Sequence, residues 1–334
     1  MGKLEYLSPT TFIRGLNCVE QIRLLKVEQV LSKDSQEQTM PMATGIAFDG
    51  MVKCELNKRF KLKEVLAEIR PENARAIEVA EAIMQHYKMG PLQSIKAEGI
   101  GYTGIDEQRD LTYLEYTSVC RGKPDVVLTD GTVIDWKVQG AFSSWGAQPK
   151  AGYCRSWVCG KDQGTHINAD FFMEQIDFGW AVQLYLYARL MGHHPGKQLR
   201  VGIEQVAVDK DNTVRIQSYR NFISYQFQLD TELKFHKMYK ALNEDESEAP
   251  HYHDKKCIQY RRLCAVANYC SGYKQFQIGR ANLSSLPVLS QAPVSYGSTV
   301  QVGDGGLCFS VRKRTDGVQP NSPLPSDSSQ PHVA

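Results

Sequence analysis

The segment from residue 124 to residue 137 constrains the fold more tightly than any other part of the chain. Two short runs of β-branched and apolar residues flank a Thr-Asp-Gly turn at residues 129–131. If Gly131 adopts the left-handed conformation, the turn is a three-residue hairpin loop that pairs Leu128 with Thr132. The sequence therefore predicts an antiparallel hairpin whose register is set by its turn.

This register places two acidic residues directly opposite each other, Asp125 on the first strand and Asp135 on the second. Because side chains alternate along a strand, Lys137 shares the face of the two carboxylates. The other face, which we expect to pack inward, carries Val126, Leu128, Ile134, Trp136 and Val138.

Two opposed carboxylates repel each other unless a cation lies between them, and oxygen ligands of this kind suit Mg²⁺ or Mn²⁺. A bound divalent ion acidifies a water ligand, and a nearby ammonium group such as that of Lys137 can orient or help deprotonate this nucleophile. The alternative is an ordinary hairpin whose exposed Asp and Lys side chains pair across the strands.

Length and composition are those of a soluble globular protein. The chain has 334 residues, 42% of them hydrophobic, and a formal net charge of +2 that is too small to indicate nucleic-acid binding by itself. No apolar run approaches the roughly 18 residues of a membrane span, and the start of the chain lacks the apolar stretch of a signal peptide. We therefore expect a cytoplasmic protein without a membrane partner.

The pattern of apolar and turn residues predicts one α/β domain over residues 1–283, with a mixed central sheet flanked by helices. Residues 284–334 are rich in Ser, Pro and Gly, and we expect a mostly disordered tail. Helices are expected from Ser8-Pro9 towards Leu24, from Asp49 to Ile69, and over residues 72–88, 172–190 and 230–242. Strands are expected between Ile95 and Val138 and over residues 200–208 and 213–229, with a long loop over residues 141–168.

Three motifs occur in the order found in a known nuclease superfamily. Gly122-Lys-Pro-Asp125 followed by Asp135-Trp-Lys137 resembles the PD-(D/E)xK signature. Gln183 and Tyr187, on an expected helix, resemble the Q-x3-Y motif of the RecB-like branch. Residues 45–49, Gly-Ile-Ala-Phe-Asp, resemble the G-x3-H motif of that branch with aspartate in place of histidine. The resemblance implies a restriction-endonuclease-like core.

The resemblance also assigns roles to residues. It implies catalytic roles for Asp125, Asp135, Lys137, Gln183 and Tyr187, and it implies a metal site at Asp49, Asp125, Asp135 and Trp136. Asp49 has an alternative role as the N-cap of a helix starting at Met51. Tyr187 and Gln183 have alternatives as a core residue and a satisfied buried amide. Glu98 is a further acidic candidate, or a solvent-facing glutamate.

The cysteines form a second pattern. Cys257, Cys264 and Cys270 follow one another closely, and Cys18 lies on the first expected helix. Spacing alone leaves zinc and an iron–sulfur cluster open, since both accept four thiolates. These four positions resemble the iron–sulfur subgroup of RecB-like nucleases, which includes CRISPR-associated exonucleases and phage proteins. The resemblance implies a 4Fe–4S cluster that joins the N- and C-terminal parts like a clasp; three unrelated buried cysteines are the alternative.

Other candidate contacts are less specific. Cys154, Cys159 and His166 offer only three ligands for a second metal site. Phosphates could be contacted by basic residues at Lys53, Lys58, Arg59, Lys61, Lys63, Lys255, Lys256, Arg261 and Arg262, and bases could stack on Trp145, Tyr153 or Trp157. The alternative for the basic residues is that they only keep a helix surface soluble. The alternative for the aromatic residues is that they pack the loop onto the rest of the domain.

Together these patterns predict a metal-dependent DNA exonuclease that hydrolyses phosphodiester bonds at DNA ends. Its expected substrate is single-stranded or resected DNA in recombination, repair or replication. Phage or host recombination proteins are its expected partners. If the protein is encoded by a phage, we expect it in the cytoplasm of the host. The rival interpretations are a non-catalytic DNA-binding protein on a nuclease fold, a zinc-bearing interaction module and a sequence-specific endonuclease.

Overall fold

The structure is a computed structural model that describes residues 3–31, 38–58, 60–104, 106–140, 146–152, 155–165, 171–244, 257–259, 262–284, 302–303 and 306–307. The chain divides into two compact units, Met1–Ala281 and Asn282–Ala334. Within the described residues, the first unit is built on a seven-stranded mixed sheet in the order β1-β4-β5-β8-β9-β6-β7. Strands β5 and β8 are parallel, and the other neighbouring pairs of this sheet are antiparallel.

The strands of this sheet are β1 (Ile100–Thr103), β4 (Val126–Leu128), β5 (Val133–Gln139), β6 (Arg155–Val158), β7 (Lys161–Thr165), β8 (Leu199–Val208) and β9 (Val214–Ile223). Strands β2 (Glu107–Tyr113) and β3 (Tyr116–Gly122) form a separate antiparallel hairpin. Short strand pairs are formed by β10 (Ile258–Gln259) with β11 (Arg262–Leu263), and in the second unit by β12 (Val302–Gly303) with β13 (Gly306–Leu307).

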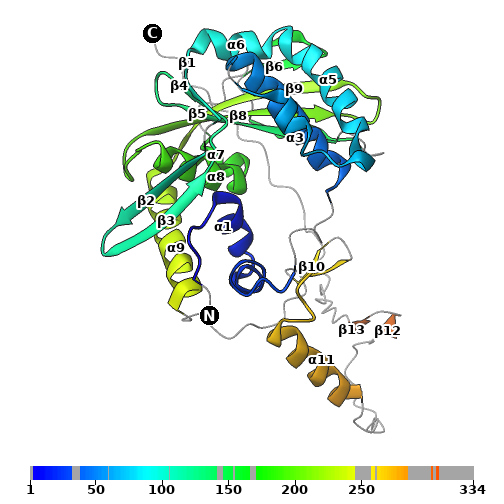
Figure 1. Ribbon diagram of the computed structural model, residues 1–334, viewed down its shortest axis with the longest axis vertical. Helices are drawn as coiled ribbons and strands as arrows, with labels where there is room; N and C mark the ends of the chain where they lie inside the picture. Colours follow the sequence, from blue (N-terminus) through cyan, green and yellow to red (C-terminus); the bar gives the residue numbers. More distant parts are fainter. Residues whose placement is uncertain are drawn as a thin grey trace, which may run out of the picture. The chain divides into compact units, whose positions relative to one another are not determined.

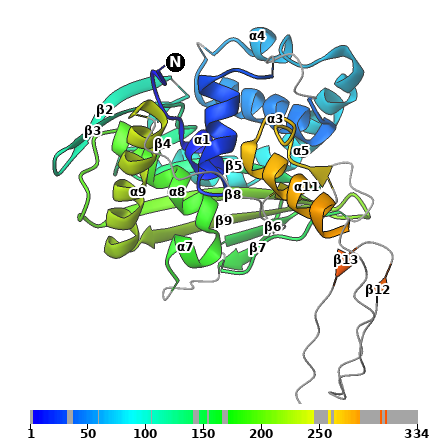
Figure 2. The same cartoon turned by 90° about the horizontal axis from the view of Figure 1, so that it is seen from below.

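Helices cover both faces of the sheet (Figures 1 and 2). On one side lie α3 (Met40–Leu56), α4 (Leu62–Leu66), α5 (Arg75–Lys88) and α6 (Pro91–Glu98). On the other lie α1 (Pro9–Gly15), α2 (Val19–Ile22), α7 (Met173–Ile176), α8 (Phe178–Leu190) and α9 (Tyr225–Glu244). A π-helical turn (Arg23–Val27), a 3₁₀ turn (Pro71–Asn73) and α11 (Ser271–Ser284) complete the described helical segments.

The hairpin register is confirmed. Val126 pairs with Ile134, and the Leu128 amide donates to the Thr132 carbonyl oxygen at 2.9 Å. Gly131 has φ +86°, in the left-handed region that the turn requires. The two faces are also as predicted, because the α3–α5 side of the sheet packs against Val126, Leu128, Ile134, Trp136 and Val138.

Several expected boundaries were wrong. Helix α3 begins at Met40, with proline in its first turn, so Asp49 lies inside this helix and is not an N-cap. The expected loop over residues 141–168 contains the β6–β7 hairpin at the sheet edge. The first helix ends at Gly15, although Ser8 caps it as expected, with its side chain accepting from the Thr11 amide. Helix α6 continues to Glu98, in a segment expected to be extended.

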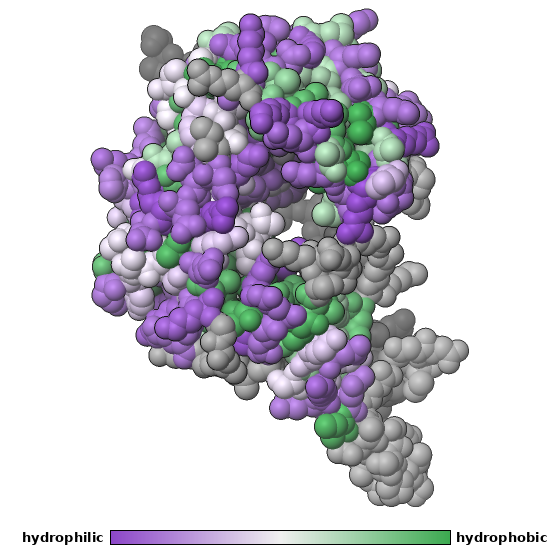
Figure 3. All heavy atoms as spheres, in the orientation of Figure 1, coloured by the Kyte–Doolittle hydropathy of each residue, from purple (hydrophilic) through white to green (hydrophobic). Residues whose placement is uncertain are grey.

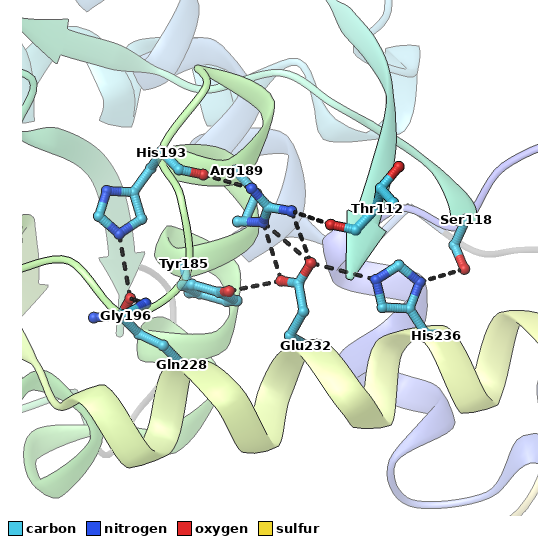
Figure 4. A network of polar contacts seen from close by, with 9 residues as sticks. All are labelled: Thr112, Ser118, Tyr185, Arg189, His193, Gly196, Gln228, Glu232 and His236. Atoms are coloured by element: carbon cyan, nitrogen blue, oxygen red, sulfur yellow. Dashed lines mark hydrogen bonds and ion pairs between the residues drawn. The ribbon is translucent and has the colours of Figure 1, made fainter. Parts of the chain in front are cut away.

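A buried polar network fixes α8 against its neighbours (Figure 4). Glu232 of α9 accepts hydrogen bonds from the Tyr185 hydroxyl at 2.6 Å and from Arg189 Nη2 at 2.9 Å. His236, one turn further along α9, contacts Glu232 at 3.3 Å and the Ser118 hydroxyl of β3 at 2.7 Å. These contacts hold α8, α9 and the β2–β3 hairpin in one arrangement.

Hydrophilic residues cover most of the described surface in the view of Figure 3. In the part of the chain that the structure describes, no helix is long and apolar enough to cross a membrane.

Candidate functional site

Three elements bring the predicted site residues together beside the start of the hairpin. Asp135 and Lys137 project from β5, and Asp125 immediately precedes β4. Helix α8 supplies Gln183 and Tyr187. The structure thus joins the residues of the hairpin motif with those of the Q-x3-Y motif in one place.

Lys137, Gln183 and Asp135 form a connected set of polar contacts. Lys137 Nζ lies 2.5 Å from Asp135 Oδ2 and donates to Gln183 Oε1 at 2.7 Å. Gln183 Nε2 donates to Asp135 Oδ1 at 3.3 Å and to the Tyr187 hydroxyl at 2.9 Å. Gln183 therefore orients both the ammonium group and the carboxylate, and Tyr187 contacts the set through its hydroxyl.

Asp125 is held from two directions. Its Oδ2 accepts the Trp136 backbone amide at 3.1 Å, and its Oδ1 accepts Lys53 Nζ at 2.7 Å. Burial opposes ionisation of Asp125, but the Lys53 ammonium and these hydrogen bonds hold the pKa of this carboxyl below its usual value. Asp125 is therefore the carboxylate of the site that remains ionised most readily.

Asp135 behaves in the opposite way. Burial raises the pKa of Asp135 to about 7, and the neighbouring Asp125 charge adds to this effect while Lys137 opposes it. Two carboxylates this close resist double ionisation unless a cation compensates them. The pair therefore favours uptake of positive charge. Tyr187, whose pKa is raised first by burial and then by Asp135, stays a neutral hydroxyl.

Asp49 reaches the site from α3 together with Lys53, which the sequence indicated only as a possible phosphate contact and not as a partner of the acidic residues. Asp49 Oδ2 accepts Lys53 Nζ at 2.6 Å, so the Lys53 ammonium lies between Asp49 and Asp125. Lys53 is only 1% exposed, so its side chain is paired inside the protein and not presented at the surface. Asp49 and Lys53 are four residues apart on one helix, a spacing that brings two side chains together on the same face. This spacing is the feature of the sequence that could have predicted the pair.

The oxygen atoms available to a cation are few. Asp49 Oδ1 and Asp135 Oδ2 are buried and have no hydrogen-bond donor within the described residues, although Asp135 Oδ2 makes the ion contact with Lys137. Trp136 can contribute only through its backbone, because its indole lies on the opposite face and donates to the Tyr87 hydroxyl at 2.7 Å. These hard oxygen donors fit Mg²⁺ or Mn²⁺.

The structure also gathers the four predicted cysteines. Gln21 Nε2, on α2, donates to Cys264 Sγ at 3.4 Å, and the Cys264 amide donates to the Cys257 carbonyl oxygen at 2.7 Å. Burial raises the pKa of Cys18, which precedes α2, and the charges of Cys270, Cys257 and Cys264 raise it further. The four thiols are thus close enough to interact electrostatically. All four are half-buried, and none forms a disulfide within the described residues.

In the part of the chain that the structure describes, no group of three or more His, Cys, Asp or Glu side chains is arranged as a metal-binding set. Of the further candidates, Trp157 is 1% exposed and packs in the core, which agrees with the alternative role in packing that the sequence also allowed. Glu98 forms an ion pair with Arg220 at 3.0 Å.

Other candidates remain predictions. Cys159 is a half-buried free thiol, and Lys58, Lys61 and Lys63 are described, with Lys61 paired to Glu64 at 2.9 Å. Outside the described residues, or with undescribed side chains, lie Arg59, Trp145, Tyr153, Cys154, His166, Lys255, Lys256, Arg261 and Arg262.

No protein-family model matches the chain, and no curated protein matches it. Among solved structures, one described as "Crystal structure of SSO0001" is similar over 77% of this chain and 96% of its own, at 12% sequence identity and a TM-score of 0.30. Likeness at this level carries no argument about fold family or function.

Proposed function

We propose that this chain is a metal-dependent deoxyribonuclease with a PD-(D/E)xK core, acting in the cytoplasm on single-stranded DNA or on DNA with free ends. The observation that carries the proposal is the arrangement of Asp125, Asp135 and Lys137, with the two carboxylates resisting double ionisation and the ammonium 2.5 Å from Asp135. A hairpin that only pairs exposed charges would not bury this group, and Asp135 is 3% exposed.

The donor set supports Mg²⁺ or Mn²⁺, held by Asp125, Asp135, the Trp136 backbone and the free Oδ1 of Asp49. When bound, such an ion would acidify a water molecule and offset charge on the phosphate. Burial lowers the pKa of Lys137, but the neighbouring Asp135 carboxylate raises it above its usual value, so Lys137 stays an ammonium group. It would orient the attacking water by donating a hydrogen bond, and the proton of that water would pass to the solvent. Gln183 keeps that ammonium in position, because its Oε1 accepts from Lys137 at 2.7 Å.

We further propose that Cys18, Cys257, Cys264 and Cys270 bind a 4Fe–4S cluster, with zinc as the competing occupant. The gathering of thiols separated by more than half the chain supports this assignment. Thiolate sites of this kind couple ligand binding to folding, since the unfolded chain holds no preformed site. The cluster would then fasten the N-terminal helices to the segment around Cys264.

The experiment that tests the nuclease uses linear single- and double-stranded DNA labelled at one end, beside circular single-stranded DNA of the same sequence. Anaerobically purified protein is incubated with Mg²⁺, Mn²⁺ or a chelator. We expect degradation of linear DNA that requires the ion, with circular DNA spared. Cleavage of the circle would instead indicate an endonuclease. DNA binding without cleavage under any ion would contradict the proposal and leave a DNA-binding protein on a nuclease fold.

A further inference from the structure

Lys53 occupies a position that the proposed chemistry does not use. Its ammonium lies 2.6 Å from Asp49 Oδ2 and 2.7 Å from Asp125 Oδ1, so it bridges two of the three acidic residues of the candidate site. A divalent ion shared by these two carboxylates would have to occupy the same space. Lys53 would therefore have to leave this position before such an ion could bind.

The surroundings of Lys53 hold it in place. The side chain is 2% exposed, and its stem passes the backbone of Gly104 at the end of β1. A Cβ atom at Gly104 would lie 3.0 Å from both Cδ and Cε of Lys53, and this glycine has φ +58°, which disfavours any other residue. Because the Gly104 amide also donates to the Asp125 carbonyl oxygen at 3.0 Å, the same segment positions both the lysine and its acidic partner.

The net charge of the site also favours a retained Lys53 with one divalent ion. When a metal ion is bound and all three carboxylates are ionised, Asp49, Asp125 and Asp135 supply three negative charges. Lys53 and Lys137 supply two positive charges, so these five side chains together carry one negative charge. One divalent ion would leave the group near neutrality, with one positive charge. Two divalent ions, which lie roughly 3.5–4 Å apart in two-metal sites, would leave three positive charges around a buried centre.

We propose that Lys53 is a resident cation that holds the place of a second metal ion, so that this site takes a single divalent ion. The inference rests on the proposed nuclease function and deepens it. The single ion uses the ligand set proposed above, which includes the free oxygen of Asp49, while the Lys53 ammonium neutralises Asp49 Oδ2 and Asp125 Oδ1.

The test counts Mn²⁺ ions bound by the full chain, by equilibrium binding and by electron paramagnetic resonance, which distinguishes an isolated Mn²⁺ from a coupled pair. Three proteins are compared: wild type, Lys53→Met and Lys137→Met. Each variant removes one ammonium group from the same site, so the two are matched in charge. Asp135→Asn gives the number of ions bound elsewhere.

We expect one isolated ion in wild type and in Lys137→Met, and a coupled pair in Lys53→Met. A coupled pair in wild type would overturn the inference, and so would one isolated ion in a folded Lys53→Met. If Lys53→Met does not fold, the wild-type count decides alone: one ion supports the inference and two overturn it.

DNA cleavage measured on the same samples separates this inference from the proposed function. A wild-type protein that cleaves DNA and holds two coupled ions contradicts the role of Lys53 alone. A wild-type protein that neither binds Mn²⁺ at this site nor cleaves DNA contradicts both.

Discussion

Gln183 is the residue that connects the separate parts of the candidate site. Its amide donates to Asp135 and to Tyr187, and its carbonyl oxygen accepts from Lys137. Replacement by leucine keeps the volume but leaves the ammonium and the carboxylate without their common partner. We expect Gln183→Leu to lower kcat by about 10–100-fold, the usual effect of removing a group that orients metal ligands.

The matched variant is Tyr187→Phe, which removes only the hydroxyl that Gln183 contacts at 2.9 Å. We expect a smaller loss of kcat and the same thermal unfolding midpoint as wild type. Equal losses in both variants would show that Tyr187 itself acts on the substrate, and an unchanged kcat in Gln183→Leu would remove Gln183 from the site.

Among single residues, the sequence predicted those contacts that are set by neighbours a few positions away along the chain. Asp125 and Asp135 were placed opposite each other because the turn at Gly131 fixes the register within a few residues. Lys53 could not be identified as a buried bridge, since a lysine on a charged helix is usually exposed. Its burial depends on Asp125, which lies 72 residues away along the chain.

Within single turns and helices, replacing a glycine by alanine should change the free energy of unfolding in opposite directions at two positions. Gly131 has φ +86° with no atom near an added Cβ, so Gly131→Ala strains the backbone without a steric clash. We expect the free energy of unfolding to fall by about 1–2 kcal/mol. Gly45 lies inside α3 with the same open space, so Gly45→Ala should raise it by about 0.8–1 kcal/mol. Urea denaturation measures the free energy of unfolding of both variants. A change of the same sign in the two variants would contradict the requirement for a left-handed residue at Gly131.

The buried carboxylate of Glu232 joins elements that are distant in sequence, α8, α9 and the β2–β3 hairpin (Figure 4). Removing the charge leaves Arg189 buried without its partner, so we expect Glu232→Gln to lower the free energy of unfolding by about 3–5 kcal/mol at neutral pH. The exposed pair of Lys61 and Glu64 provides the control, because Glu64→Gln should change it by less than about 1 kcal/mol.

The effect of Glu232 should also depend on pH. Burial alone would raise the pKa of Glu232, but hydrogen bonds from His236, Arg189 and Tyr185 lower it below the unfolded value. Its contribution is therefore complete above an unfolded pKa of about 4.3 and is lost as pH falls through the folded pKa. The free energy of unfolding of wild type should therefore exceed that of Glu232→Gln by less at acidic pH than at neutral pH. Urea denaturation at both pH values measures this difference, and a larger difference in acid would contradict the role of Glu232.

Element boundaries were predicted less well than the hairpin, for physical reasons. Helix α3 starts at Met40, but the strongest apolar pattern follows Asp49, which suggested a later start. Strand β7 is exposed along its whole length, so it has no alternating apolar pattern to reveal it. It pairs with β6, and β6 pairs on its other side with β9, which follows roughly fifty residues later, so the position of this hairpin at the sheet edge involves a contact between distant parts of the sequence.

At the scale of the whole molecule, the four gathered cysteines make a prediction about metal content. We expect anaerobically purified protein to contain iron and acid-labile sulfide in equal amounts, and Cys264→Ser to lose both and to unfold more easily. Cys54→Ser, which replaces a half-buried thiol on α3, is the matched control and should keep the cluster. Zinc in place of iron would identify the competing occupant, and a protein with neither would contradict the site.

In the proposed nuclease, Asp125, Asp135 and Lys137 would perform metal-dependent DNA cleavage. The most direct test of this role is the single-turnover rate on end-labelled single-stranded DNA at saturating Mn²⁺. We compare wild type with Lys137→Met and with Asp130→Asn, which alters an exposed carboxylate in the hairpin turn. We expect a rate lower by about 10²–10⁴-fold for Lys137→Met and an unchanged rate for Asp130→Asn. Cleavage by Lys137→Met at the wild-type rate would contradict this role.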